Sequence, residues 1–311
     1  MATPSRRCPR FMGGILPWGR WRECFSPHPS PLRRLPGTMW SMQEMPPFPP
    51  PEDLRWALRG LPLSAWWYFP AVGSTNAVAL TWAEAGAPDG CLVLADEQTQ
   101  GRGRLGRRWY TPPGAALAFT VLLRPLPDEV PALSRWAVWG GLAVALALER
   151  QWGVRPRLKW PNDVLLEGRK VAGVLAETLW QGDRPRAVAL GIGVNLAPQA
   201  VPPEAWLDFP AGCVADAVGR PVARWAFLRF VLETLLAWRT RVPTKAFLEA
   251  WEARLAYRGQ PVQATLPGGE WVQGVVEGLT SQGALRLRLP SGAVRVLRDT
   301  VTHLRPIAEE A

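Results

Sequence analysis

Apolar residues recur along this chain with two periods, that of a helix and that of a strand. The changes from one period to the other divide the chain into regions. In the first region, apolar runs of strand length alternate with segments of helical period. This pattern predicts helices at 52–59, 74–85 and 133–152, and strands at 65–69, 91–95 and 115–123. The most apolar stretch, 136–148, spans 13 residues, which is too short to cross a bilayer, so we expect a buried helix there.

Strands predominate after this helix. Short strands joined by tight turns are expected at 157–160, 163–166, 170–179 and 186–194, and helices return at about 225–238 and 244–254. The predicted fold class is α+β, with a mixed, largely antiparallel sheet flanked by helices. Beyond Tyr257, five short strands predict a small C-terminal β-barrel, at 261–266, 270–277, 284–289, 293–297 and 301–304.

Composition changes this picture mainly at the N-terminus. Residues 1–51 are rich in proline and arginine and show no sustained period, which predicts a disordered segment or one outside the natural product; Met39, Met42 and Met45 are alternative starts. A transit peptide is the alternative, although the signals of an amphipathic helix are absent. Residues 1–50 carry a charge of +5 within a net charge of +10, so basicity alone does not indicate nucleic-acid binding. The expected domains are then 52–256 and 257–311.

The residue types available restrict the chemistry. The four cysteines have no C-x-x-C spacing, which argues against a zinc site or a disulfide framework and favours a reducing cytoplasm. The two histidines are His28 and His303, so catalysis in the central region falls to lysine, arginine and carboxylates. Among 36 basic residues only three are lysines, and two of these, Lys159 and Lys170, lie close together in sequence.

A glycine- and arginine-rich segment, GRGRLGRRW at 101–109, follows the strand at 91–95. Glycines let a backbone approach a ligand, and guanidinium groups match phosphate and carboxylate oxygens, so this loop is suited to close over an anion. A dinucleotide-binding G-x-G-x-x-G turn is the alternative. It is disfavoured because residues 97–100 separate the loop from the strand, and TPPG follows where a helix should begin.

Four further segments suggest one ligand site. Ser74, Thr75 and Asn76 offer polar groups at a helix start, with a plain helix cap as the alternative, and Gln98 suits a ureido or amide group unless it belongs to a solvated loop. Lys170 begins a strand in which Gly173 permits close approach, although a lysine at such a position is often only solvated. Gly191 and Gly193 alternate in an apolar strand, which indicates that a ligand or a neighbouring backbone packs over them.

Four ordered motifs, GRGRLGRRW, KWPNDV, KVAGVLAE and GIGVNL, resemble the catalytic core of biotin protein ligases, also called biotin–[acetyl-CoA-carboxylase] ligases. The resemblance covers about residues 54–305 and implies a class II synthetase-like core with an SH3-like barrel. It implies a two-step activity. Biotin and Mg-ATP give biotinyl-5′-AMP and pyrophosphate. The ε-amine of a lysine on a biotin carboxyl carrier domain then attacks the mixed anhydride, which forms an amide and releases AMP.

The resemblance also implies roles for particular residues. Lys170 and Arg104 are the implied catalytic residues, with Lys170 between the biotin carboxylate and the α-phosphate. The implied biotin site comprises Ser74, Thr75, Asn76, Gln98, Arg102, Gly103, Arg104, Lys170, Gly173, Leu175, Gly191 and Gly193. The implied ATP site comprises Arg104, Arg107, Trp109, Asn162, Asp163, Lys170 and Asn195, with Asp163 also a candidate ligand for Mg²⁺.

The chain departs from the family pattern at several points. Leu105 stands where many members carry another arginine, and residues 1–50 cannot supply a helix-turn-helix, so specific DNA binding is not expected. The proline-rich segment after Asn195 is expected to form a loop on the adenylate side. A lipoate–protein ligase and a non-catalytic nucleic-acid-binding protein are the alternatives. We expect a cytoplasmic protein without a membrane partner, and a homodimer is left open.

Overall fold

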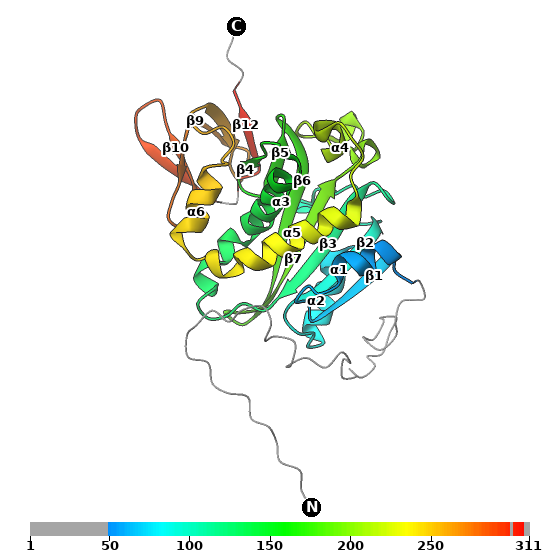
Figure 1. The fold of residues 1–311 in the computed structure, drawn as a ribbon. Coiled ribbons are helices and arrows are strands. Elements are labelled where there is room, and N and C mark those ends of the chain that lie inside the picture. Colours follow the sequence, from blue (N-terminus) through cyan, green and yellow to red (C-terminus); the bar gives the residue numbers. More distant parts are fainter. Residues whose placement is uncertain (1–48, 299–300, 308–311) are drawn as a thin grey trace, which may run out of the picture. The chain divides into compact units, whose positions relative to one another are not determined.

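The computed structural model describes residues 49–298 and 301–307 (Figure 1). The segment predicted to be disordered, 1–51, therefore lies outside the described residues except for its last three positions. The described residues belong to one compact unit, which contains all the helices and strands named here.

A seven-stranded sheet forms the centre of this unit, in the order β1-β2-β3-β7-β6-β5-β4. Among the described strands of this sheet, β1 and β2 run parallel and the other neighbouring pairs run antiparallel. This confirms the mixed, largely antiparallel sheet predicted from the short turns. The strands are β1 Ala65–Val72, β2 Cys91–Gln98, β3 Ala116–Leu123, β4 Arg157–Lys159, β5 Asp163–Leu166, β6 Arg169–Gln181 and β7 Arg184–Asn195.

Helices cover both faces of the sheet. Helix α3 (Trp136–Trp152) packs on the face that carries Val174 of β6 and Ile192 of β7, and a Cβ on Gly140 of α3 would lie 2.8 Å from Val174 Cγ1. Helix α2 (Thr75–Glu84) brings Asn76 against Gly191, the neighbour of Ile192. Because successive residues of a strand point to opposite faces, α2 and α3 lie on opposite sides of the sheet.

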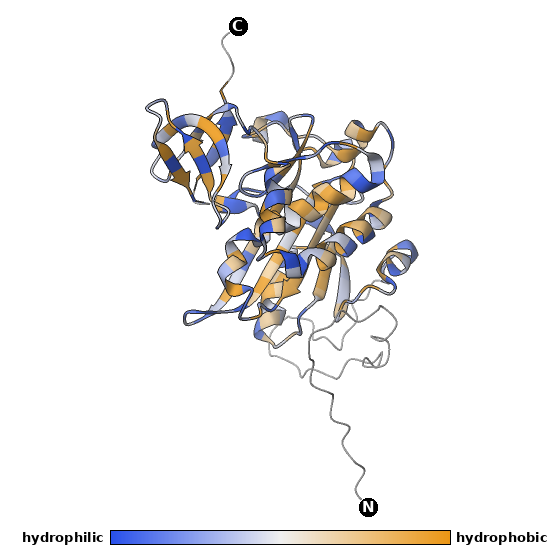
Figure 2. Ribbon diagram, turned by 60° about the vertical axis from the view of Figure 1, so that its left-hand side comes forward, coloured by the Kyte–Doolittle hydropathy of each residue, from blue (hydrophilic) through white to orange (hydrophobic). Residues whose placement is uncertain are grey.

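The apolar stretch that contains α3 is buried, as predicted. Among the described residues, the helical stretch 130–152 is apolar and long enough to cross a membrane, but 61% of its most apolar window is buried. Helix α5 (Arg224–Trp238) packs on α3, and α1 (Glu52–Leu58) packs on α5. The stretch begins as a 3-10 turn at Val130–Arg135, with proline in its first turn, so the α-helix starts three residues later than the predicted 133. Figure 2 shows apolar residues gathered on the central strands and the helices beside them.

The C-terminal strands form a five-stranded antiparallel sheet in the order β11-β10-β9-β8-β12, as the turn pattern predicted. Its strands are β8 Pro261–Thr265, β9 Trp271–Leu279, β10 Leu285–Arg288, β11 Val294–Leu297 and β12 His303–Pro306. Helix α6 (Lys245–Glu252) precedes this small barrel, and a short helix that the apolar pattern did not predict, α4 (Val214–Val218), follows the large sheet.

Candidate functional site

A cavity of about 510 Å³ lies where the glycine-arginine loop, β6, β7 and β12 meet. Every residue that the sequence assigned to the biotin and ATP sites lines this cavity. The structure therefore brings together side chains that are separated by up to about 120 positions in the chain, from Ser74 to Asn195. Their individual roles remain predictions, and the contacts below are the basis for them.

One end of the cavity holds a network of uncharged hydrogen-bonding groups. Gln98 Oε1 accepts bonds from the backbone N–H of Thr75 at 2.9 Å and from its hydroxyl at 3.1 Å. The Thr120 hydroxyl lies 2.8 Å from Thr75 Oγ1 and donates to Asn76 Oδ1 at 2.6 Å. Ser74 is the residue before helix α2, but its side chain makes no capping bond, so the plain-cap alternative does not account for it. This end is suited to a neutral polar ring.

The alternating glycines of β7 lie beneath side chains. A Cβ on Gly191 would overlap the Asn76 amide, and a Cβ on Gly193 would overlap the Trp109 indole. The sequence predicted a ligand or a backbone over these glycines, and the structure shows that polar and aromatic side chains cover them. Gly193 also pairs with Gly173 across β6 and β7, and the Trp109 indole lies over both of these glycines.

The two lysines of the KWPND and KVAGVLAE motifs share one carboxylate. Lys170 Nζ lies 2.6 Å from Asp163 Oδ1, and Lys159 Nζ lies 3.3 Å from Asp163 Oδ2. Burial alone would raise the pKa of Asp163, but the two ammonium groups outweigh it and hold that pKa below its usual value. Burial, followed by the charge of Lys170, lowers the pKa of Lys159 even though Asp163 opposes the shift.

The Lys170 backbone is fixed as well. Its N–H donates to Pro210 O at 2.8 Å, and its carbonyl accepts from the Gly212 N–H at 3.0 Å. Asn195 Nδ2 donates to Gly212 O at 3.1 Å. The adenylate-side loop expected after Asn195 thus runs beside the lysine as a short bridge to β6.

The glycine-arginine loop is a closed turn. Gly103 N–H donates to Arg107 O at 2.7 Å, and Trp109 N–H donates to Gly101 O at 2.9 Å. At its tip Leu105 and Gly106 have φ of 57° and 74°, so a leucine occupies the left-handed region that favours glycine. Arg104 NH1 donates to Asn162 Oδ1 at 3.4 Å, and Asn162 Nδ2 donates to Val174 O at 2.7 Å, which brings the loop to the KWPND motif.

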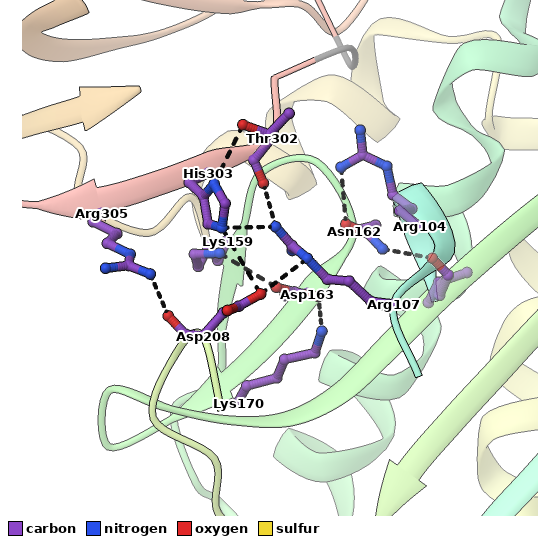
Figure 3. Close-up of polar contacts among 11 residues, drawn as sticks. Arg104, Arg107, Lys159, Asn162, Asp163, Lys170, Asp208, Thr302, His303 and Arg305 are labelled. Carbon is purple, nitrogen blue, oxygen red and sulfur yellow. Dashed lines mark hydrogen bonds and ion pairs between the residues drawn. The ribbon is translucent and has the colours of Figure 1, made fainter. Parts of the chain in front are cut away.

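Strand β12 of the small barrel closes the far side of the cavity (Figure 3). Arg107 donates to Thr302 O at 2.7 Å and pairs with Asp208 at 3.2 Å. His303 Nε2 lies 3.0 Å from the Arg107 guanidinium, and burial followed by that charge lowers the pKa of the histidine. Arg305 donates to Asp208 O at 2.7 Å. Figure 3 shows Arg107 between Asp208 and β12, with Lys170 directed at Asp163.

Several cavity residues were not predicted from the sequence. Trp206 packs edge-on against Tyr110 with ring centroids 6.1 Å apart, and the Arg108 guanidinium lies 5.4 Å from its ring. Lys159 Nζ lies 4.6 Å from the Phe209 ring. Two aromatic residues in a proline-rich segment were the available signal for this part of the site. Thr120 was detectable only as a polar residue inside an apolar strand, and His303 and Asp208 lacked a local motif.

These features define a class of protein: an α+β enzyme core whose pocket combines a neutral polar end, a glycine-lined floor and a cluster of cations suited to anionic oxygens. Comparison with known proteins identifies the family. A family model described as "Biotin/lipoate A/B protein ligase family" matches residues 68–195, and one described as "Biotin protein ligase C terminal domain" matches residues 258–302.

Individual relatives agree with the family models. The "Biotin--[acetyl-CoA-carboxylase] ligase" of Paracoccus denitrificans is 41% identical over 226 residues, which cover 70% of this chain and 92% of that protein. The protein of the same name from Mycobacterium tuberculosis is 37% identical over 239 residues, covering 75% and 86%. The solved structure "Biotin protein ligase from Aquifex aeolicus in complex with biotin and ATP" has 29% identity and a TM-score of 0.67, and covers 79% of this chain and 100% of that one.

The chain therefore belongs to the biotin/lipoate A/B protein ligase family. The resemblance to biotin protein ligases that its four motifs indicated is confirmed.

Proposed function

We propose that the protein is an ATP-dependent biotin protein ligase, which forms biotinyl-5′-AMP and transfers the biotinyl group to a lysine of a biotin carboxyl carrier domain. The observation that carries the proposal is the position of Lys170, which lies beside Gly173 and lines the same cavity as the arginines of the loop. The relatives named above support biotin as the acid, and the Aquifex aeolicus structure was solved with biotin and ATP.

In the proposed first step, a biotin carboxylate oxygen attacks the α-phosphorus of ATP and pyrophosphate leaves. The carboxylate and the α-phosphate are both negatively charged as they approach, and charge then builds up on the phosphate oxygens and the leaving pyrophosphate, so a cation held between the reacting groups lowers the barrier. Lys170 would serve both groups, with Arg104 on the phosphate. The uncharged network around Gln98, Thr75 and Asn76 would hold the ureido ring. The chain of the acid would pass beside Gly173 and Gly193, next to the Trp109 indole that lies over them.

In the proposed second step, the ε-amine of the carrier lysine attacks the carbonyl carbon of the mixed anhydride. The C–O bond to AMP breaks, the amide forms, and the amine loses a proton. The groups that stabilised the phosphate then stabilise AMP as the leaving group. Trp109 and Asn195 line the same cavity and are proposed to contact the adenylate.

Mg²⁺ is proposed to enter with the ATP phosphates. Within the described residues, no group of three or more His, Cys, Asp or Glu side chains could hold a metal ion. Asp163 directs one oxygen to each of two lysines, so its geometry fits lysine positioning better than metal ligation. When present, the ion would supply charge neutralisation at the phosphates, as is usual where Mg²⁺ is held by few protein ligands.

The remaining assignments complete the proposal. The partner is a carrier domain of acetyl-CoA carboxylase or another biotin-dependent carboxylase, and specific DNA binding is not expected. A homodimer is left open. The division into a catalytic domain at 52–256 and a barrel domain at 257–311 is part of this proposal. The described cysteines, Cys91 and Cys213, are free and buried, which is consistent with a cytoplasmic protein.

The test is acid-dependent adenylation. The purified protein is incubated with Mg-ATP and either biotin or lipoate, and the acyl-adenylate and pyrophosphate are measured. We expect biotinyl-AMP to form and lipoyl-AMP to be absent or much slower. Adenylation of lipoate but not biotin would assign the chain to the lipoate branch instead. Nucleic-acid affinity that falls steeply with salt, without any adenylate formation, would support the binding-protein alternative.

A further inference from the structure

Glu177 of β6 lies beside the cavity without lining it, and the steps proposed above give it no role. Its side chain points to the same face of the sheet as Leu175 and Gly173, because alternate residues of a strand share a face. Its two oxygens have different partners. Oε2 accepts a bond from Asn76 Nδ2 at 2.7 Å, and Oε1 lies 3.4 Å from Arg102 NH2.

The Asn76 side of this contact is rigid. The amide donates to Glu177 and to Leu175 O at 3.2 Å, and its oxygen accepts from the buried Thr120 hydroxyl. Both N–H groups and the oxygen are therefore occupied by protein atoms, and the amide covers Gly191. The same network continues through Thr75 to Gln98. Glu177 is thus one of the groups that fix the end of the cavity proposed to hold the ureido ring.

The Arg102 side is adjustable. Arg102 lies at the base of the glycine-arginine loop, where its backbone forms an isolated antiparallel β-bridge with that of Arg108. Its side chain is 48% exposed, and that of Glu177 is 27% exposed. An ion pair this open to solvent changes an equilibrium constant only a few-fold, which suits a loop that must open and close in each turnover.

We propose that Glu177 is a positioning residue that links the fixed Asn76 amide, at the ring end of the cavity, to Arg102 and so favours the closed form of the glycine-arginine loop. This proposal rests on the biotin ligase function. The fixed Asn76 amide orients the Glu177 carboxylate, and this carboxylate holds the Arg102 side chain in the closed loop. Its consequence is retention of the acid and of the adenylate, with the chemical step itself left to Lys170.

Three variants separate the two halves of the coupling. Glu177→Gln keeps an oxygen for Asn76 but removes the charge that holds Arg102. Arg102→Met removes the other partner of the ion pair. Glu177→Ala removes both contacts. Glu277→Gln is the matched control, because Glu277 also pairs with arginines across a sheet and its side chain is 25% exposed, but it lies in β9 away from the cavity.

For each variant we would measure the KM for biotin, the kcat for pyrophosphate release and the dissociation rate of biotinyl-AMP. Glu177→Gln should raise adenylate dissociation about 2- to 5-fold with little change in kcat. Glu177→Ala should in addition raise the KM for biotin by about 10-fold. The double variant Glu177→Gln, Arg102→Met should release biotinyl-AMP no faster than the faster single variant, because both substitutions remove the same ion pair. Glu277→Gln should match the wild type in all three quantities.

Additive effects of Glu177→Gln and Arg102→Met would overturn the coupling, and so would a Glu177→Ala variant that loses kcat with unchanged KM and unchanged leakage. Glu177→Gln retains the size and hydrogen-bonding shape of glutamate, so the proposal stays testable if Glu177→Ala fails to fold. A wild-type protein that makes no biotinyl-AMP would refute the proposed function itself. If the wild type makes biotinyl-AMP and the Glu177 variants match it in all three quantities, only the coupling is refuted.

Discussion

At Lys170 the side chain and the backbone are fixed by different partners. Asp163 holds the ammonium group from within the KWPND motif, and the 210–212 segment holds the peptide on either side. A lysine is otherwise a flexible point charge with several rotatable bonds, so this double restraint reduces the freedom that it must lose when substrates bind. A lysine at the start of a strand is often solvated. At Lys170 the ammonium group instead has a buried carboxylate partner, Asp163.

Replacing Lys170 by alanine should reduce biotin adenylation by at least about 100-fold, because one preorganised cation is removed from the developing charge. Biotin-dependent pyrophosphate release measures this directly. Lys245→Ala is the control, since Lys245 is 88% exposed and pairs only with Glu249 on the surface of α6. A Lys170→Ala protein that releases pyrophosphate at a near-normal rate would refute the assigned role.

Asp163→Asn tests whether this carboxylate positions lysines or binds metal. The amide keeps the shape but leaves two ammonium groups close together without their shared negative charge, so kcat should fall by about 10-fold or more. The Mg²⁺ concentration that gives half-maximal rate should stay the same. A large rise in that concentration, measured by titrating MgCl₂ at fixed ATP, would instead make Asp163 a metal ligand.

At the scale of elements, most strands were predicted well because apolar runs and turn residues are both local signals. Strands β1 and β2 each run three residues beyond the predicted ends at 69 and 95, so Gln98 lies in β2 and not in a loop. The turn at Glu167 and Gly168, which joins β5 to β6, was read directly from the sequence. The 3-10 start of the α3 stretch and the short helix α4 were missed, since an apolar pattern does not distinguish a tight turn from an α-helix over so few residues. Much of the site could also be predicted from the sequence, because each motif lies on a single loop or strand. Asp208 and His303 were not predicted, since their meeting depends on how a loop and the barrel pack.

Two adjacent glycines of α3 should respond oppositely to alanine. At Gly140 a Cβ would lie 2.8 Å from Val174 Cγ1, so Gly140→Ala should destabilise the fold by about 1–3 kcal/mol. At Gly141 the nearest atom is Leu158 Cδ2 at 3.5 Å, an ordinary contact, and Gly141→Ala should stabilise by up to about 1 kcal/mol. Urea unfolding of the two variants and the wild type measures the difference. Equal destabilisation by both would contradict the helix position.

At the scale of the whole molecule, the small barrel contributes to the site from two directions. His303 of strand β12 and Thr302 just before it contact Arg107 on one side of the cavity. On the other, the turn between β9 and β10 accepts a bond at Gly283 O from Trp160 Nε1, within the KWPND motif, at 3.1 Å. The barrel thus supports both the loop that carries Arg104 and the motif that carries Asp163, the ion-pair partner of Lys170. Contacts that join remote parts of the chain in this way leave no signal in sequence spacing.

A protein that begins at Met45 should retain the full rate of biotin transfer, because the described residues form a compact unit that contains every residue of the cavity. Any DNA affinity of the longer chain should fall in the shorter one, since the removed segment carries much of the positive charge. Biotinylation of a carrier domain and a salt titration of DNA binding check the two parts. Loss of transfer in the shorter protein would show that the N-terminal segment takes part in catalysis.

The backbone hydrogen bonds between Lys170 and residues 210–212 allow the movement of this loop to be followed by hydrogen exchange. The Lys170 amide proton is held by Pro210 O, so it can exchange with deuterium only when the adenylate-side loop separates from β6. If ligands close this region, exchange at that amide should slow when biotin and ATP are bound. The movement of a loop is thereby recorded at the residue assigned to the chemistry, without any attached probe.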